Sequence, residues 1–126
     1  MSLNYISTEK APGAVGPYSQ GITFGDFVYT SGQLPIDPTT GVLVSDIQEA
    51  TKVALNNVKA VLEAGGAGLD TVIKVTVFVK NMDDFSKINE IYSTYFTDHK
   101  PARSLVEVAR LPKDGVIEIE AIAHKK

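Results

Sequence analysis

The sequence contains no cysteine, no tryptophan and only two histidines, and these absences exclude several kinds of chemistry. Without cysteine the chain can form no disulfide, no thiolate nucleophile and no thiolate metal site. His99 and His124 stand in no metal-binding spacing such as HExxH, so we expect no metal centre. The lack of cysteine also favours the cytoplasm as the expected location.

Strong charge and long apolar runs are absent as well. The formal net charge is −3 and the lysines and arginines are scattered, unlike the basic surface of a nucleic-acid-binding protein. No apolar run approaches the roughly 20 residues that span a bilayer, and no signal-peptide pattern precedes the first predicted strand. There is no GxSxG nucleophile elbow and no GxxxxGK[ST] phosphate loop. We therefore expect partners other than membranes and nucleic acids.

What remains is the composition of a globular protein. Of the 126 residues, 44% are hydrophobic and 21% are charged, so we expect residues 1–126 to form one domain with a buried core. Runs rich in β-forming residues alternate with turn signals and with two helical patterns. Six strands are predicted, at residues 19–24, 27–31, 42–44, 71–80, 104–111 and 116–123.

The two predicted helices have recognisable ends. Ser45 with Gln48 resembles a capping box that opens the first helix, and Gly65-Gly66 stops it. Asp83 or Asp84 is expected to cap the second helix. Its predicted buried stripe consists of Phe85, Ile88, Tyr92 and Phe96. Two helices can cover only one face of a sheet, so the sequence predicts an α+β fold with one sheet face left uncovered.

The uncovered face is predicted to be mixed in character. In strand 71–80 the apolar face consists of Ile73, Val75, Val77 and Val79, and the other face of Lys74, Thr76 and Phe78. In the last strand the mixed face consists of Glu118, Glu120 and Ile122. Such a surface is too apolar for free water and too charged for a core. We therefore predict that it contacts another subunit in a homo-oligomer.

The C-terminal segment 101–123 reads as two strands around a turn, with Arg103, Glu118 and Glu120 on one face. Arg103 is either a strand-end arginine that extends into solvent or a rigid fork for a small carboxylate. Glu118 and Glu120 point the same way because they are two residues apart in a strand. They either form structural ion pairs, or one of them orients and deprotonates a water molecule.

Three other residues admit both a structural and a functional interpretation. Tyr18 follows Gly16-Pro17, so its ring can pack or its hydroxyl can point to a ligand. Asn89 lies at the edge of the apolar stripe of the second helix, where it is exposed or needs a polar partner. Gly32 either relieves a strand bend or lets a ligand approach the backbone.

The stretch "PARSLVEVARLPKDGVIEIEAIA" closely resembles the signature of the Rid family of reactive intermediate deaminases, also called the YjgF family. The resemblance continues in "APGAVGPYSQG", "YTSGQLPIDPTTG" and "VIKVTVFVKNMDDFSKINEIY", and so covers nearly the whole chain in order. It implies a chorismate-mutase-like fold with a mostly antiparallel six-stranded sheet. It also implies a homotrimer around a barrel-like centre, with active sites between neighbouring subunits.

The resemblance implies an activity and residue roles as well. Family members with these motifs hydrolyse 2-imino acids such as 2-iminobutanoate and 2-iminopropanoate to 2-keto acids and ammonia, without a cofactor. Arg103 matches the arginine that holds the substrate carboxylate. Glu118 matches the residue that positions the attacking water, whereas Glu120 keeps its structural interpretation.

The supporting residues follow by the same resemblance. Tyr18 matches a tyrosine that hydrogen-bonds in the site, Asn89 a supporting polar residue and Gly32 the backbone lining. Ser104 falls near the position where many relatives carry a cysteine, and we include it among the substrate-binding residues. Two other functions stay open. One is a non-catalytic module that binds small carboxylates, and the other is the ribonuclease or translation inhibitor described for some relatives.

Overall fold

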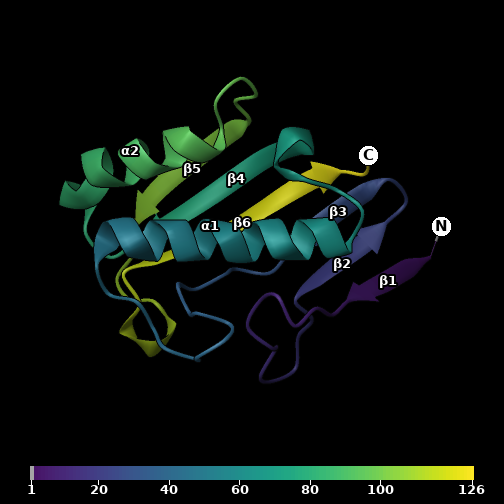
Figure 1. The fold of residues 1–126 in the computed structure, drawn as a ribbon, viewed down its shortest axis with the longest axis horizontal. Coiled ribbons are helices and arrows are strands. Elements are labelled where there is room, and N and C mark those ends of the chain that lie inside the picture. The colour runs from purple at the N-terminus through teal and green to yellow at the C-terminus, as the bar shows by residue number, and fades with distance from the viewer. Residues whose placement is uncertain (1) are drawn as a thin grey trace.

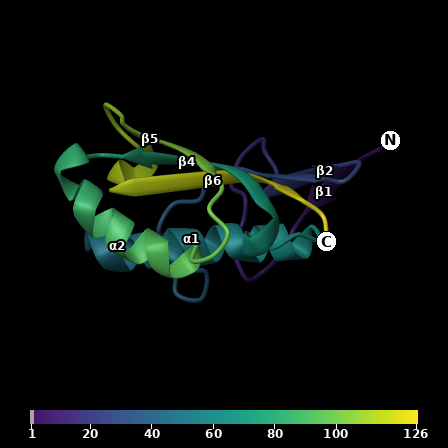
Figure 2. The same cartoon turned by 90° about the horizontal axis from the view of Figure 1, so that it is seen from above.

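The computed structural model describes residues 2–126 and contains one six-stranded sheet with two α-helices packed on one face, as Figures 1 and 2 show. The predicted α+β arrangement is therefore confirmed. The strands are β1 Leu3–Ile6, β2 Gly21–Phe24, β3 Phe27–Thr30, β4 Val72–Val79, β5 Ala102–Glu107 and β6 Ile117–His124. The helices are α1 Ile47–Ala64 and α2 Phe85–Tyr95, with short 3₁₀ turns at Leu69–Thr71 (η1), Met82–Asp84 (η2) and Pro112–Asp114 (η3). No helix of this described chain is both long and apolar enough to cross a membrane.

The strand order is β1-β2-β3-β6-β4-β5. Every neighbouring pair is antiparallel except β4 and β5, which are parallel and connected through α2. The two C-terminal strands follow one another in the sequence, yet they are not neighbours in the sheet. β6 inserts between β3 and β4, whereas β5 lies on the far side of β4 (Figure 1).

The prediction of a strand at 42–44 is wrong, and the sixth strand is instead β1. Leu43 makes only an isolated bridge with Ile36, because the turn-rich chain around it offers no neighbouring strand. β1 pairs with β2 along its whole length. A β-forming run becomes a strand only where a partner edge is within reach, and sequence alone does not show which edge that is.

α1 begins one residue later than predicted. Its N-cap is Asp46, whose side chain accepts a hydrogen bond from the backbone N–H of Glu49 at 3.1 Å, so the proposed capping box at Ser45 is not formed. The predicted stop at Gly65 is confirmed. The buried face of α1 packs on β6 and β3, where it forms part of the core. Its buried residues are Ile47, Ala50, Thr51, Ala54, Leu55, Asn57, Val58, Val61 and Leu62.

A β-bulge in β4 changes one predicted face. The pairing register with β6 shifts between Val72 and Lys74. As a result Val72 enters the core with 1% exposure, whereas Ile73, which we predicted to be buried, is 45% exposed. Val75, Val77 and Val79 keep the predicted orientation. The remainder of the mixed, uncovered face is as predicted, with Glu118, Glu120 and Ile122 of β6 half-buried there.

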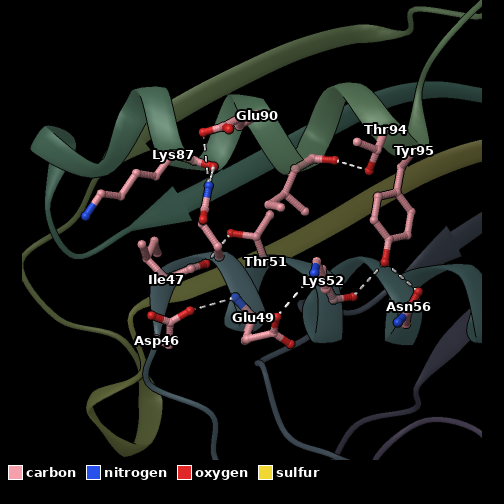
Figure 3. Close-up of polar contacts among 12 residues, drawn as sticks. Asp46, Ile47, Glu49, Thr51, Lys52, Asn56, Lys87, Glu90, Thr94 and Tyr95 are labelled. Atoms are coloured by element: carbon pink, nitrogen blue, oxygen red, sulfur yellow. Dashed lines mark hydrogen bonds and ion pairs between the residues drawn. The ribbon is translucent and has the colours of Figure 1, made fainter.

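α2 lies beside α1 on the same face of the sheet, and Figure 3 shows polar contacts between them. The Gln48 side-chain amide donates to a Glu90 carboxylate oxygen at 3.1 Å, and the Tyr95 hydroxyl donates to Asn56 Oδ1 at 2.8 Å. Asp84 is the N-cap of α2, as one of the two predictions had it, but its side chain makes no capping hydrogen bond. The predicted buried stripe is correct for Ile88 and wrong for Phe85, which is 40% exposed.

Candidate functional site

Arg103 and Glu118 lie on opposite faces of the sheet. In the parallel register of β4 and β5, Arg103 is the partner of the buried Val75, so its side chain is on the helix-covered face. In the antiparallel register of β4 and β6, Glu118 is the partner of Phe78, which belongs to the uncovered face. The prediction that these charges share one face is therefore wrong. The error arises because β5 and β6 do not form a hairpin but flank β4 on either side.

The Arg103 guanidinium is held against one side of α2. Its Nη1 donates a hydrogen bond to Asn89 Oδ1 at 2.8 Å. Its central carbon lies 4.7 Å from the ring centroid of Tyr92 and 5.8 Å from that of Phe85, which are cation–π distances. The structure thus brings together Arg103 and Asn89, two of the predicted site residues. They line a small cavity of about 260 Å³ together with Tyr92, Ser93, Phe96, Lys100 and Pro101.

Three other predicted residues meet in a second cleft, of about 480 Å³. Tyr18, Gly32 and Glu118 all line it. The chain around Gly32 is placed by Gln33, whose backbone N–H and C=O bond to the backbone of Ile119 in β6 at 2.8 and 3.1 Å. Much of the remaining lining is apolar or proline, namely Pro12, Val15, Leu34, Ile36 and Pro112. A small ligand with an aliphatic body fits this character.

Gly32 is needed because the Glu118 side chain crosses over it. A Cβ atom at position 32 would overlap the Glu118 carboxylate and would lie 2.7 Å from its Cδ. The sequence suggested that Gly32 relieves a strand bend or lets a ligand approach the backbone. The structure shows that the Glu118 side chain approaches this backbone. Any side chain at position 32 would therefore displace the carboxylate.

The Glu118 carboxylate is half-buried and accepts no hydrogen bond from any residue in 2–126. Burial raises the pKa of the Glu118 carboxyl above the ordinary value of a glutamate, and the negative charge of Glu120 raises it further. The shift makes Glu118 a stronger base than an exposed glutamate, which suits a group that takes a proton from water and gives it back.

Tyr18 and Ser104 occupy different surroundings. Tyr18 is 54% exposed at the rim of the Glu118 cleft, in a tight turn where its backbone N–H bonds to the Gly16 carbonyl at 3.0 Å. Ser104 lines neither cavity. It lies on the uncovered face, where its hydroxyl accepts a hydrogen bond from Lys74 Nζ at 2.9 Å.

Two buried amides that shape the Glu118 cleft were missed by the sequence reasoning. Gln20 donates to the carbonyls of Thr8, Ala11 and Pro12 at 3.0, 3.3 and 2.8 Å. Asn57 of α1 donates to the carbonyls of Leu34 and Ile36 at 3.1 and 2.9 Å. A signal for Asn57 was available in the sequence, because asparagine is a poor helix former that stands in the interior of the first predicted helix and needs polar partners if it is buried there.

The chemistry available to one chain is therefore divided. One face offers an immobilised cation in a small cavity, and the other offers a basic carboxylate in a larger cleft. Between residues 2 and 126 no group of three His, Asp or Glu side chains is placed to hold a metal ion. Within one chain, Arg103 and Glu118 therefore line different cavities.

Known proteins similar to this chain cover almost its full length. Residues 8–125 match the family described as endoribonuclease L-PSP. A RutC family protein from Pyrococcus abyssi is 56% identical over all of both chains. A 2-iminobutanoate/2-iminopropanoate deaminase from Salmonella typhimurium is 52% identical over 96% of this chain and 97% of that protein.

The structural comparison agrees. The crystal structure of TdcF from Escherichia coli with bound serine superposes with a TM-score of 0.94 and 48% identity, over 98% of this chain and 99% of that one. The extent of the match, together with the imine deaminase name carried by a relative of more than half identity, fits the resemblance seen in the sequence motifs. The chain belongs to the endoribonuclease L-PSP family, which is the YjgF/Rid family.

Proposed function

We propose that the protein hydrolyses 2-imino acids such as 2-iminobutanoate and 2-iminopropanoate to 2-keto acids and ammonia. The observation that carries the proposal is the Glu118 carboxylate, which lies half-buried in a cleft of fitting size, with a raised pKa and without a hydrogen-bond partner in the described chain. The relative from Salmonella typhimurium supports the choice of substrate through its name. The cytoplasm stays the predicted location.

The reaction needs little from the protein, because the carbon of a protonated imine is already electrophilic. Arg103 binds the substrate carboxylate through its free N–H groups. Glu118 accepts a proton from water while the water oxygen bonds to the imine carbon and the C=N electron pair moves to nitrogen. Glu118 then gives this proton to nitrogen, which makes the nitrogen a leaving group. The C–N bond breaks while the hydroxyl oxygen forms the carbonyl and returns its proton to Glu118, and the ammonia released takes that proton up, which restores the carboxylate. We assign Tyr18, which lines the same cleft as Glu118, a hydrogen bond to the substrate.

We further propose that each active site lies between neighbouring subunits of a homotrimer, with Arg103 from one subunit and Glu118 from the next. Their positions on opposite faces of one sheet support this arrangement. So do the exposed aromatic side chains on the same face as Glu118, among them Tyr5 at 75%, Phe27 at 42% and Tyr29 at 41%. Burial of this face would remove them from water.

Mixing two inactive variants tests both proposals. Arg103→Ala and Glu118→Gln are each expected to reduce imine hydrolysis to near the buffer rate. When equal amounts are unfolded and refolded together, a site with both native residues forms in one case of four, so about one quarter of wild-type activity returns. If the imine is hydrolysed equally fast with wild-type protein and in buffer alone, the proposed activity is wrong. If wild type is active but the mixture stays inactive, the proposal that two subunits form each active site is wrong.

A second candidate is a non-catalytic module that binds small carboxylates. The cavity beside Arg103 favours it, because this cavity exists within one chain and does not need Glu118. TdcF, a structural relative, holds serine in its crystal structure, which is a small carboxylate. Calorimetry with 2-ketobutyrate separates the two candidates. Binding that is equal in wild type and Glu118→Gln, with no imine turnover in either protein, would favour the module.

A further inference from the structure

One side of α2 presents a row of residues to Arg103. Phe85, Asn89, Tyr92 and Phe96 follow at spacings of about one helical turn, so they lie on one stripe of the helix. Asn89 accepts the hydrogen bond from Arg103, and the ring of Tyr92 lies under the guanidinium. The Tyr92 ring in turn packs on Phe96, with centroids 4.8 Å apart, and Phe96 is 5% exposed. The guanidinium therefore rests on a stack that is anchored in the core.

The hydroxyl of Tyr92 does not take part in this arrangement. It is buried and has no hydrogen-bond partner among residues 2–126. Burial raises the pKa of this phenol, although the positive charge of Arg103 opposes the rise, so it stays neutral at physiological pH. A buried hydroxyl without a partner is a net cost to stability. Within one chain, Tyr92 contacts Arg103 through its ring and not through its hydroxyl.

We propose that Tyr92 is a positioning residue for Arg103, whose ring face holds the guanidinium so that its free N–H groups face the substrate carboxylate. Arginine has five N–H donors, and Asn89 occupies one of them. The ring contact fixes the plane of the guanidinium. It leaves the remaining N–H donors on the guanidinium edge free for a bidentate pair of hydrogen bonds to the substrate carboxylate. The role in substrate binding depends on the proposed function, whereas the contact itself does not.

Kinetic comparison of three variants tests the role. Tyr92→Phe keeps the ring and is expected to keep KM for 2-iminobutanoate within about twofold. Tyr92→Leu fills similar space without a π face, and KM should rise roughly 3- to 30-fold while kcat changes less. Tyr95→Leu is the matched control on the same helix. The Tyr95 hydroxyl bonds to Asn56 of α1 (Figure 3), whereas the rings near Arg103 are those of Tyr92 and Phe85. Tyr95→Leu should lower stability and leave KM unchanged.

An NMR measurement gives a readout that needs no activity. Protons of the Arg103 side chain above the Tyr92 ring should be shifted upfield by the ring current in the free protein. The shift should persist in Tyr92→Phe and disappear in Tyr92→Leu. The proposal is overturned if wild type lacks the shift, or if KM rises equally in the phenylalanine and leucine variants or in neither. If the shift behaves as expected but wild type hydrolyses no imine, the positioning contact stands and the proposed function fails.

Discussion

The two cavities of this molecule treat their charged groups in opposite ways. Arg103 is surrounded by partners, with an amide oxygen, one ring face and a second ring nearby, all from α2. Glu118 accepts no hydrogen bond from the described chain, and its carboxylate occupies the space that a side chain at position 32 would need. The difference teaches which job each group can do. A binding group gains from being held still before the ligand arrives, whereas a proton carrier needs lone pairs that are free.

The largest expected effects come from removing the two charges, and they should differ in kind. Arg103→Ala should raise KM for the imine roughly 100-fold or more, because two charge-assisted hydrogen bonds are lost. Glu118→Gln should instead lower kcat by about 10²- to 10⁴-fold with a smaller change in KM. Steady-state kinetics measure both, with the exposed Arg110→Ala as a control that should behave as wild type. A loss of kcat alone in Arg103→Ala would contradict the assignment of a binding role.

Gly32→Ala tests how closely the carboxylate must be placed. The new methyl group overlaps the Glu118 carboxylate, which is the movable end of a side chain, so the protein should stay folded while the carboxylate shifts. We expect kcat to fall about 10- to 100-fold with little change in Tm.

Gly21→Ala is the control, in which the added Cβ meets the core and not the carboxylate. The Cβ would lie 2.7 Å from Val61 and 2.8 Å from the Tyr29 carbonyl oxygen. Tm should therefore fall in Gly21→Ala. An equal loss of Tm in Gly21→Ala and Gly32→Ala would contradict the prediction.

Asn57→Ala tests whether the loop of the Glu118 cleft depends on a buried amide. The substitution removes two hydrogen bonds. The Ile36 carbonyl loses its partner, whereas the Leu34 carbonyl still accepts a hydrogen bond from the Ile36 backbone N–H at 2.8 Å. The free energy of unfolding should fall by about 1–3 kcal/mol, measured by urea denaturation. The neighbouring Asn56→Ala is the control, because Asn56 is exposed and its side chain accepts one hydrogen bond, from the Tyr95 hydroxyl. Its cost should be smaller, and the reverse order would contradict the prediction.

The smallest effect is expected from Glu120→Gln, which removes the second cause of the raised Glu118 pKa. The pKa of Glu118 should fall, so the acidic limb of the pH profile of kcat/KM should move to lower pH. A shift to higher pH would exclude repulsion between the two carboxylates.

The raised pKa of Glu118 should also make the stability of the protein depend on pH. Because the folded-state pKa of Glu118 is raised, the native protein holds this proton more tightly than the unfolded chain does. The free energy of unfolding therefore falls as pH rises through the interval between the unfolded and folded pKa values, and stays lower above it. Glu118→Gln removes this loss, so we expect it to be more stable than wild type at neutral pH although it is inactive. Denaturant titrations at acidic and neutral pH measure the difference.

Sequence patterns predicted local features well and pairings poorly. The end of α1 at Gly65 and the alternating faces of β6 follow from short-range rules, and the structure has both. The exposure of Ile73 could not be predicted, because a bulge depends on the neighbouring strand. For the same reason candidate site residues could be named from the family resemblance, but the opposite orientation of Arg103 and Glu118 could not be derived. It depends on β6 inserting between β3 and β4.

That insertion has a consequence for the order in which the molecule can assemble. The residues that line the Arg103 cavity all lie between positions 89 and 103, so the cavity is lined by near neighbours in the sequence. The Glu118 cleft joins residue 12 to residue 118 and closes only when β6 enters the gap between strands synthesised much earlier. A nascent chain shorter than 117 residues contains Arg103 and α2 but lacks both β6 and Glu118. The residues of the Arg103 cavity are thus all synthesised before the strand that carries Glu118.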